Sequence, residues 1–241
     1  MSIRAVLLDI EGTTTPIAFV HDVLFGYARE RLEPFLRDGW DEPDTRADVA
    51  ALRAEAGEDE DDADLEWALS YVRALMDEDR KSTALKSLQG RIWKAGYRDG
   101  TLVAEVYPDV PRALERWRTQ GRDVCIFSSG SVLGQRLLFE HTNVGDLTPH
   151  LRGYFDTTTG PKREPASYTA IAAALGLAPA EMLFASDVVA ELDAARETGM
   201  STLLCVRDGE VAPDESGGHE VIHDFDGVLY AARVEQGSAT A

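Results

Sequence analysis

The chain has 241 residues and 44% hydrophobic content, enough for one large domain or for a core domain with a smaller companion. Its 24 basic and 43 acidic residues give a formal net charge of −19. That charge argues against nucleic acid or an anionic membrane surface as the main partner, because attraction to a polyanion needs a basic field. An anionic substrate must therefore be held by a locally positive pocket.

No secretory apolar region and no segment of membrane-spanning length occurs in the sequence, so we expect a cytoplasmic protein. Nothing in the sequence demands a partner chain, and we expect a monomer. Cys125 and Cys205 both lie in apolar runs, which is typical of buried free thiols rather than of a disulfide framework. His219 and His223 have i, i+4 spacing but flank a short strand-like segment, so we do not assign them a zinc site.

The first predicted element is a strand over residues 3–10, and a helical stretch without a convincing strand follows at about 20–100. Within this stretch an apolar stripe at helical spacing predicts a helix, formed by Leu65, Leu69, Val72, Leu75 and Met76. The acidic run 58–64 before it is interpreted as a solvated loop leading into that helix. We expect residues 19–102 to form a helical cap domain inserted into a core domain of residues 1–18 and 103–241.

From about residue 103 the sequence alternates apolar runs with helix-like segments. Continuous apolar strands are predicted at 124–129, 181–186 and 201–206, with helices between them that end at glycines. This alternation predicts an α/β fold with a parallel sheet and helices on both faces.

Polar residues follow the predicted strands. Asp9 and Glu11 come after the first, Ser128 and Ser129 after the second, and Asp187 after a later one, while Lys162 lies in a loop between them. In a parallel sheet the carboxyl ends of the strands share one edge, so these residues are expected to meet. Carboxylates at that density call for a hard cation such as Mg²⁺, and the hydroxyls, helix-start N–H groups and lysine can take a phosphate. Together they describe a site for phosphoryl transfer.

Each of these features also has an ordinary explanation. The acidic pair can be a polar strand end, the double serine a helix N-cap and turn, Lys162 a solvated surface lysine, and Asp187 a helix N-cap. His21 near the first motif can be a proton donor or simply a hinge or surface residue, and Glu191 can support Asp187 or lie on a solvated helix face. The occurrence of all the strand-end residues in one order within one predicted sheet favours the functional interpretation.

Four segments carry a resemblance to a known family: residues 9–20, 127–139, 155–172 and 184–200. Their order, with an inserted helical segment after the first, resembles the haloacid dehalogenase superfamily of phosphotransferases. Within it, the glutamate at position 11 and the double serine resemble the enolase-phosphatases of methionine salvage. The resemblance implies a Rossmann-like core with an inserted α-helical cap, although the cap itself resembles the family only loosely.

By that resemblance, Asp9 is the nucleophile that forms an aspartyl phosphate and Lys162 offsets charge between nucleophile and phosphate. Ser128 and Ser129, with Lys162, bind the phosphorylated substrate, and one Mg²⁺ per chain is held by Asp9, Glu11 and Asp187, with Glu11 acting through its backbone or its carboxylate. Asp9 and Glu11 are expected to face one cavity, since alternate residues of a strand point the same way.

The implied reaction converts the small phosphorylated diketone 2,3-diketo-5-methylthiopentyl 1-phosphate into an acireductone and phosphate. The catalytic residues are then Asp9, Glu11 and Lys162, and the apolar residues of the 16–30 segment can receive the methylthio tail or serve only for packing. Two alternatives stay open: a phosphatase or phosphomutase for another small metabolite on the same scaffold, and a non-catalytic protein that binds a phosphorylated ligand.

Overall fold

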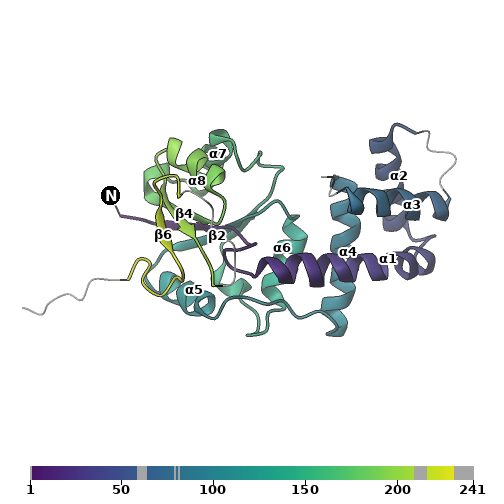
Figure 1. Ribbon diagram of the computed structural model, residues 1–241, viewed down its shortest axis with the longest axis horizontal. Helices are drawn as coiled ribbons and strands as arrows, with labels where there is room; N and C mark the ends of the chain where they lie inside the picture. The colour runs from purple at the N-terminus through teal and green to yellow at the C-terminus, as the bar shows by residue number, and fades with distance from the viewer. Residues whose placement is uncertain (1, 59–63, 79, 81, 209–215, 231–241) are drawn as a thin grey trace, which may run out of the picture.

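A six-stranded parallel sheet forms the centre of the core (Figure 1). The computed structural model describes residues 2–58, 64–78, 80, 82–208 and 216–230. In sheet order the strands are β3 (Gly153–Phe155), β2 (Asp123–Phe127), β1 (Ala5–Leu8), β4 (Met182–Ser186), β5 (Ser201–Cys205) and β6 (Glu220–Ile222). The prediction of a parallel α/β sheet is confirmed. The sequence reading missed β3, because a three-residue edge strand carries little periodicity.

Helices cover both faces of this sheet (Figure 1). They are α5 (Asp109–Thr119), α6 (Val132–Glu140), α7 (Pro165–Leu175) and α8 (Val189–Glu197), with short 3₁₀ turns at Thr148–His150 and Pro179–Glu181. Successive residues of β1 enter different apolar clusters: Val6 and Leu8 pack with α5 and α6, whereas Ala5 and Leu7 pack with α7 and α8. This two-sided burial explains why the strands are continuous apolar runs. Cys125 and Cys205 are buried free thiols, as expected.

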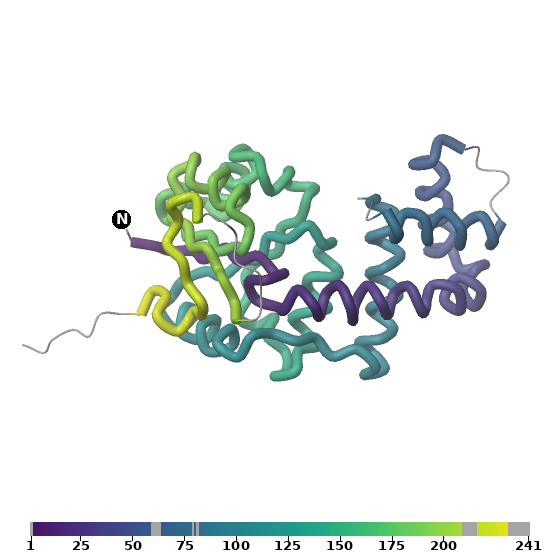
Figure 2. Tube along the Cα trace, in the orientation of Figure 1, coloured from purple at the N-terminus to yellow at the C-terminus, as the bar shows by residue number. Residues whose placement is uncertain are grey.

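The chain leaves the sheet after β1 and returns before α5 (Figure 2). The excursion contains a π-helical segment (Phe19–Phe25) that runs into α1 (Gly26–Asp38), followed by α2 (Pro43–Ala56), α3 (Leu65–Asp77) and α4 (Thr83–Asp99). The predicted apolar stripe is confirmed in α3, where Leu69, Val72 and Leu75 are buried. Residues 59–63 of the acidic run lie outside the described residues. The division into a core of residues 1–18 and 103–241 and a cap of residues 19–102 stays a prediction.

The strand order places two carboxylates at the point where the sheet changes winding direction. From β1 the order runs to β2 and β3 on one side and to β4, β5 and β6 on the other. In open parallel sheets a crevice forms outside the carboxyl ends of the strands at such a switch point. Asp9 directly follows β1 and Asp187 directly follows β4, so both lie at this crevice.

Candidate active site

A buried lysine joins two acidic side chains at the carboxyl edge of the sheet. Lys162 Nζ lies 2.7 Å from Asp9 Oδ1 and 2.6 Å from Glu191 Oε2, and its side chain is only 9% exposed. Burial by itself lowers the pKa of Lys162, but the charges of Asp9 and Glu191 and their hydrogen bonds outweigh burial and leave that pKa raised. The lysine is therefore a fixed cation, and the interpretation of Lys162 as a solvated surface residue is wrong.

Asp9 is oriented by donors on both carboxylate oxygens. Its Oδ1 accepts a hydrogen bond of 2.8 Å from its neighbour Ile10 N in addition to the Lys162 contact, and its Oδ2 lies 3.3 Å from Ser186 Oγ. Ser186 Oγ also lies 3.1 Å from Glu191 Oε2, and because a hydroxyl carries one proton it donates to only one of these carboxylates at a time. Asp9 is 5% exposed and is held in one orientation.

Helix α7 fixes the loop that carries Lys162. Tyr168 Oη donates to the carbonyl of Lys162 at 2.7 Å, and Ser167 Oγ donates to the carbonyl of Pro161 at 2.7 Å. Both α7 side chains are buried, and the Tyr168 ring packs against Phe127 and Phe184. The lysine therefore reaches Asp9 from a loop whose backbone is tied to the core.

Asp187 lies against the turn that follows Asp9. Gly12 has a φ of +62°, and a Cβ built there would lie 2.5 Å from Asp187 Oδ2, so the close approach requires glycine. Burial, followed by the charge of Asp9, raises the pKa of Asp187 to about 7. The alternative interpretation of Asp187 as a helix N-cap is wrong, because Val188 occupies the N-cap position of α8.

The double serine lies in the loop between β2 and α6. Ser128 Oγ accepts a hydrogen bond of 3.2 Å from Gly130 N, and the N-cap of α6 is Ser131 rather than either predicted serine. Gln135 on α6 donates to the carbonyls of Gly130 and Phe155, both at 2.8 Å, which fixes the loop against the end of β3. The loop thus presents hydroxyls and N–H groups at a helix N-terminus, a setting that suits a phosphate.

A cavity of about 550 Å³ lies between the sheet edge and the helices of the inserted segment. Glu11, Ser128 and Ser129 line it on the core side. The inserted segment contributes apolar residues and three cations: Val20, Leu24, Phe25, Leu75, Met76, Leu85, Trp93, Arg29, Arg80 and Lys86. Two of these cations are paired with carboxylates, Arg29 with Asp77 at 2.6 Å and Arg80 with Glu78 at 3.8 Å, so the locally positive pocket expected for an anionic substrate stays a prediction.

The expectation that Asp9 and Glu11 face one cavity stays a prediction. Strand β1 ends at Leu8, and a tight turn follows in which Thr13, Thr14 and Thr15 all donate their N–H to the carbonyl of Ile10. Glu11 lines the cavity, with its Oε2 3.6 Å from His21 Nε2, whereas Asp9 is not among the lining residues. Because β1 ends before Asp9, alternation along an extended strand does not by itself decide how these two side chains point.

The donor set at the switch point fits a hard divalent cation. In the described part of the chain no three carboxylate, imidazole or thiol groups are gathered closely enough to hold a metal ion. Two carboxylates, those of Asp9 and Asp187, do lie close enough for the first to raise the pKa of the second, and Lys162 pairs with Asp9 and Glu191 instead of Asp187. Mg²⁺ is commonly held by one or two carboxylates and by water, so these residues suit it.

The structure adds residues that the sequence reading missed or left open. Glu191 is buried and paired with Lys162, so the alternative of a solvated helix face is wrong, and Ser186 is part of the same network. Only their positions in the sequence could have indicated these two residues, because Ser186 ends β4 and Glu191 lies on the first turn of α8. The cavity cations on α1 and α4 carried no signal, since they lie far along the chain from the core motifs.

No described helix is both long enough and apolar enough to cross a membrane. A family model described as haloacid dehalogenase-like hydrolase matches residues 3–199. The chain is 51% identical to "Enolase-phosphatase E1" of Pseudomonas aeruginosa (strain UCBPP-PA14) over 225 residues, covering 93% of this chain and 97% of the relative. It is 48% identical over 232 residues to the Azotobacter vinelandii protein of the same name, covering 96% and 100%.

Among solved structures, the chain is similar to the UTR4 protein (Unknown transcript 4 protein) of Saccharomyces cerevisiae, with a TM-score of 0.78 and 35% identity, covering 94% of this chain and 100% of that one. These matches extend over both the sheet and the inserted helices, beyond the four motifs. The chain belongs to the haloacid dehalogenase-like hydrolases and, within them, to the enolase-phosphatase E1 family.

Proposed function

We propose that this chain is an enolase-phosphatase of methionine salvage, which converts 2,3-diketo-5-methylthiopentyl 1-phosphate into 1,2-dihydroxy-3-keto-5-methylthiopentene, an acireductone, and phosphate. The single observation that carries the proposal is the buried Asp9–Lys162–Glu191 network beside a cavity lined by Glu11, Ser128 and Ser129. The near-full-length identity to relatives named enolase-phosphatase E1 supports the substrate.

In the phosphatase half, Asp9 attacks phosphorus and forms an aspartyl phosphate while the bond from phosphorus to the substrate oxygen breaks. Two anions approach each other in this step, and the fixed ammonium of Lys162 lowers their repulsion. Ser128 and Ser129 donate to the phosphate oxygens from the β2–α6 loop. Water then attacks the phosphorus, releases phosphate and regenerates the Asp9 carboxylate.

In the enolase half, a carbon-bound proton leaves and negative charge develops on the neighbouring oxygen. Mg²⁺, one ion per chain, would be held by Asp9, Asp187 and the backbone or side chain of Glu11, and it would supply Lewis-acid stabilisation of the developing oxyanion. Glu11 lies in the cavity beside His21, and its side chain reaches one methylene further than an aspartate. We infer that this reach brings the carboxylate to the carbon-bound proton. Unchanged enolisation by Glu11→Asp, followed through the enol chromophore, would remove that role.

The apolar cap residues in the cavity, among them Leu24, Phe25 and Trp93, suit the methylthio tail of the substrate. We also propose that the protein is a cytoplasmic monomer in which residues 19–102 form the cap. Size-exclusion chromatography with light scattering measures the molar mass in solution and so tests whether the protein is a monomer.

The decisive experiment is incubation with the diketone phosphate and Mg²⁺, with ultraviolet absorbance and free phosphate recorded together. We expect an enol absorbance and stoichiometric phosphate. Phosphate release without an enol product would leave a simple phosphatase and refute the enolase half. If the wild type releases phosphate neither from this substrate nor from an aryl phosphate, and Asp9→Asn behaves like the wild type, the result would favour a protein that binds a phosphorylated ligand without catalysis.

A further inference from the structure

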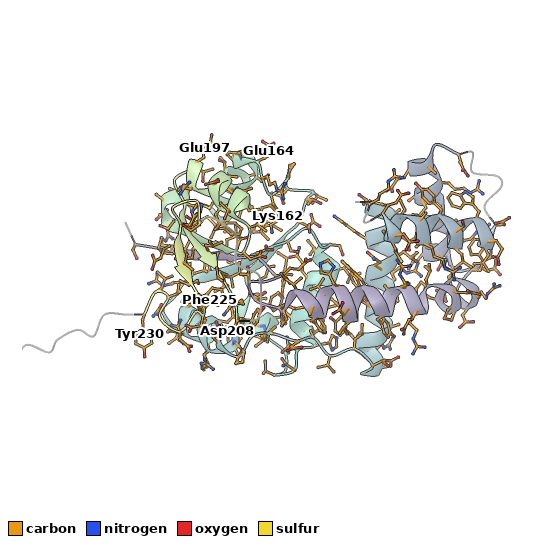
Figure 3. The ribbon with its side chains drawn as sticks, in the orientation of Figure 1. Lys162, Glu164, Glu197, Asp208, Phe225 and Tyr230 are labelled. Carbon is orange, nitrogen blue, oxygen red and sulfur yellow. The ribbon has the colours of Figure 1, made fainter. Side chains whose placement is uncertain are left out.

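Arg207 lies just beyond β5 and is buried although it is a charged residue outside the network of Asp9, Lys162 and Glu191. Its side chain is 3% exposed, and its Nη1 lies 2.8 Å from Asp109 Oδ2, near the start of α5. Figure 3 labels Asp208, which follows it in the chain, and Phe225, whose ring packs against its guanidinium. A buried arginine is costly to desolvate, so the use of its other donors needs an explanation.

Two of those donors hold one backbone carbonyl in the turn after Asp9. Nε and Nη2 of Arg207 donate to Thr13 O at 2.9 and 2.6 Å, and Nη1 also donates to His223 O at 3.1 Å. The turn is buried, since Thr13, Thr14 and Thr15 are all 0% exposed. A carbonyl buried in this way needs a donor, and Arg207 supplies it.

The guanidinium is itself held in one plane. It lies over the rings of Tyr107 and Phe225, with its central carbon 4.5 and 4.6 Å from the ring centroids. Tyr107 N donates to Thr14 O at 3.0 Å, so a second contact ties the same aromatic residue to the turn. Phe225 N donates to Asp109 Oδ2 at 2.7 Å, which closes the cluster. Lysine cannot reproduce this arrangement, because it lacks the planar fork and the flat faces.

The turn adjoins both carboxylates at the switch point. Gly12, next to Thr13, lies against Asp187, and Asp9 begins the turn. We propose that Arg207 is a positioning residue, which fixes the turn of residues 9–15 so that Asp9 and Asp187 hold their cation in the geometry that phosphoryl transfer requires. This inference rests on the proposed function for its catalytic consequence only.

The test compares Arg207→Lys with Arg116→Lys. Arg116 is a matched control, because it too donates to backbone carbonyls, those of Phe225 and Val228, and lies over an aromatic ring, Trp117. Within the described residues its hydrogen bonds go to the 225–228 segment and not to the turn. Three quantities are measured for both variants and the wild type: the melting temperature, the Mg²⁺ dissociation constant by calorimetry after chelation, and kcat with the diketone phosphate.

Both variants are expected to melt at lower temperature. Only Arg207→Lys is expected to weaken Mg²⁺ binding and lower kcat, each by roughly 10- to 100-fold, the range seen when a residue behind a metal ligand is changed. Mg²⁺ affinity and kcat within about 2-fold of the wild type in Arg207→Lys, or equal losses in Arg116→Lys, would overturn the proposal.

If Arg207→Lys does not fold, Asp109→Asn provides the milder variant, because it removes the charge that holds the guanidinium while keeping an acceptor oxygen. Its Mg²⁺ affinity should fall by a few-fold at a smaller loss of melting temperature, and unchanged affinity contradicts the inference. The calorimetric measurement needs no substrate. If the wild type binds Mg²⁺ but does not turn over the diketone phosphate, the proposed function is refuted. The role of Arg207 in Mg²⁺ binding is then still tested by the calorimetric comparison.

Discussion

Replacement of Lys162 by methionine removes the cation shared by two buried carboxylates. Asp9 and Glu191 side chains are 7% and 11% exposed, and their oxygens lie 2.7 and 2.6 Å from Nζ. Removal of one partner of a buried ion pair leaves an uncompensated charge and typically costs ~3–5 kcal/mol. We therefore expect Lys162→Met to lose about that much of its free energy of unfolding in chelator-treated protein at neutral pH.

The deficit should depend on pH in a defined direction. Burial, followed by the charge of Asp9, raises the pKa of the Glu191 carboxyl, and the variant lacks the lysine charge that opposes them. Below the unfolded-state pKa of this carboxyl, it is protonated in both states and the variant retains most of its stability. As pH rises through the raised folded-state pKa, the folded state must ionise the carboxyl against burial, and stability is lost.

Urea denaturation at a series of pH values measures this deficit. Lys94→Met is the matched control, because Lys94 is exposed, and its change should stay within about 0.5 kcal/mol. In Lys162→Met combined with Glu191→Gln, part of the loss should return, with a coupling of roughly 1–3 kcal/mol. A single Lys162→Met variant as stable as the Lys94 control at neutral pH would refute the reasoning.

Three further predictions concern the groups around this network. Gly12→Ala should lower phosphate release more than 10-fold, because its Cβ would lie 2.5 Å from Asp187 Oδ2. Gly100 also has a positive φ but has nothing within 4 Å of a built Cβ, so Gly100→Ala should lower stability without lowering activity. Equal losses of activity in the two variants would contradict the prediction. Metal-free wild type should lose stability relative to Asp187→Asn as pH rises from 3.8 through about 7, because a carboxyl whose pKa is raised on folding stabilises the folded state only at pH values below that pKa. Mg²⁺ should raise the melting temperature of the wild type more at pH 8 than at pH 6. Parallel pH profiles of stability for the wild type and Asp187→Asn would contradict this prediction. Tyr168→Phe should cost about 1 kcal/mol in urea and reduce kcat, because Lys162 O loses its donor; an unchanged kcat would show that the loop needs no anchor.

The sequence by itself determined the class of fold and the neighbourhood of the site. Continuous apolar runs require burial on both faces, which helices on either side of a parallel sheet provide, and this constraint placed Asp9, Ser128 and Asp187 at one edge. The apolar stripe in the inserted segment likewise fixed helix α3, because its spacing has the period of a helix.

Only the tertiary structure decided which side chains are partners. The local sequence around Glu191 is the same as that expected for a glutamate on a solvated helix face. Glu191 is buried and paired because Lys162 approaches it from a loop 29 residues earlier in the chain. The end of β1 at Leu8, before Asp9 and Glu11, is set by pairing with β2 and β4 rather than by local propensity. Arg207 carried no signal at all, because the carbonyl it holds lies 194 residues away. Such contacts arise from chain topology, which brings together residues that no local pattern connects.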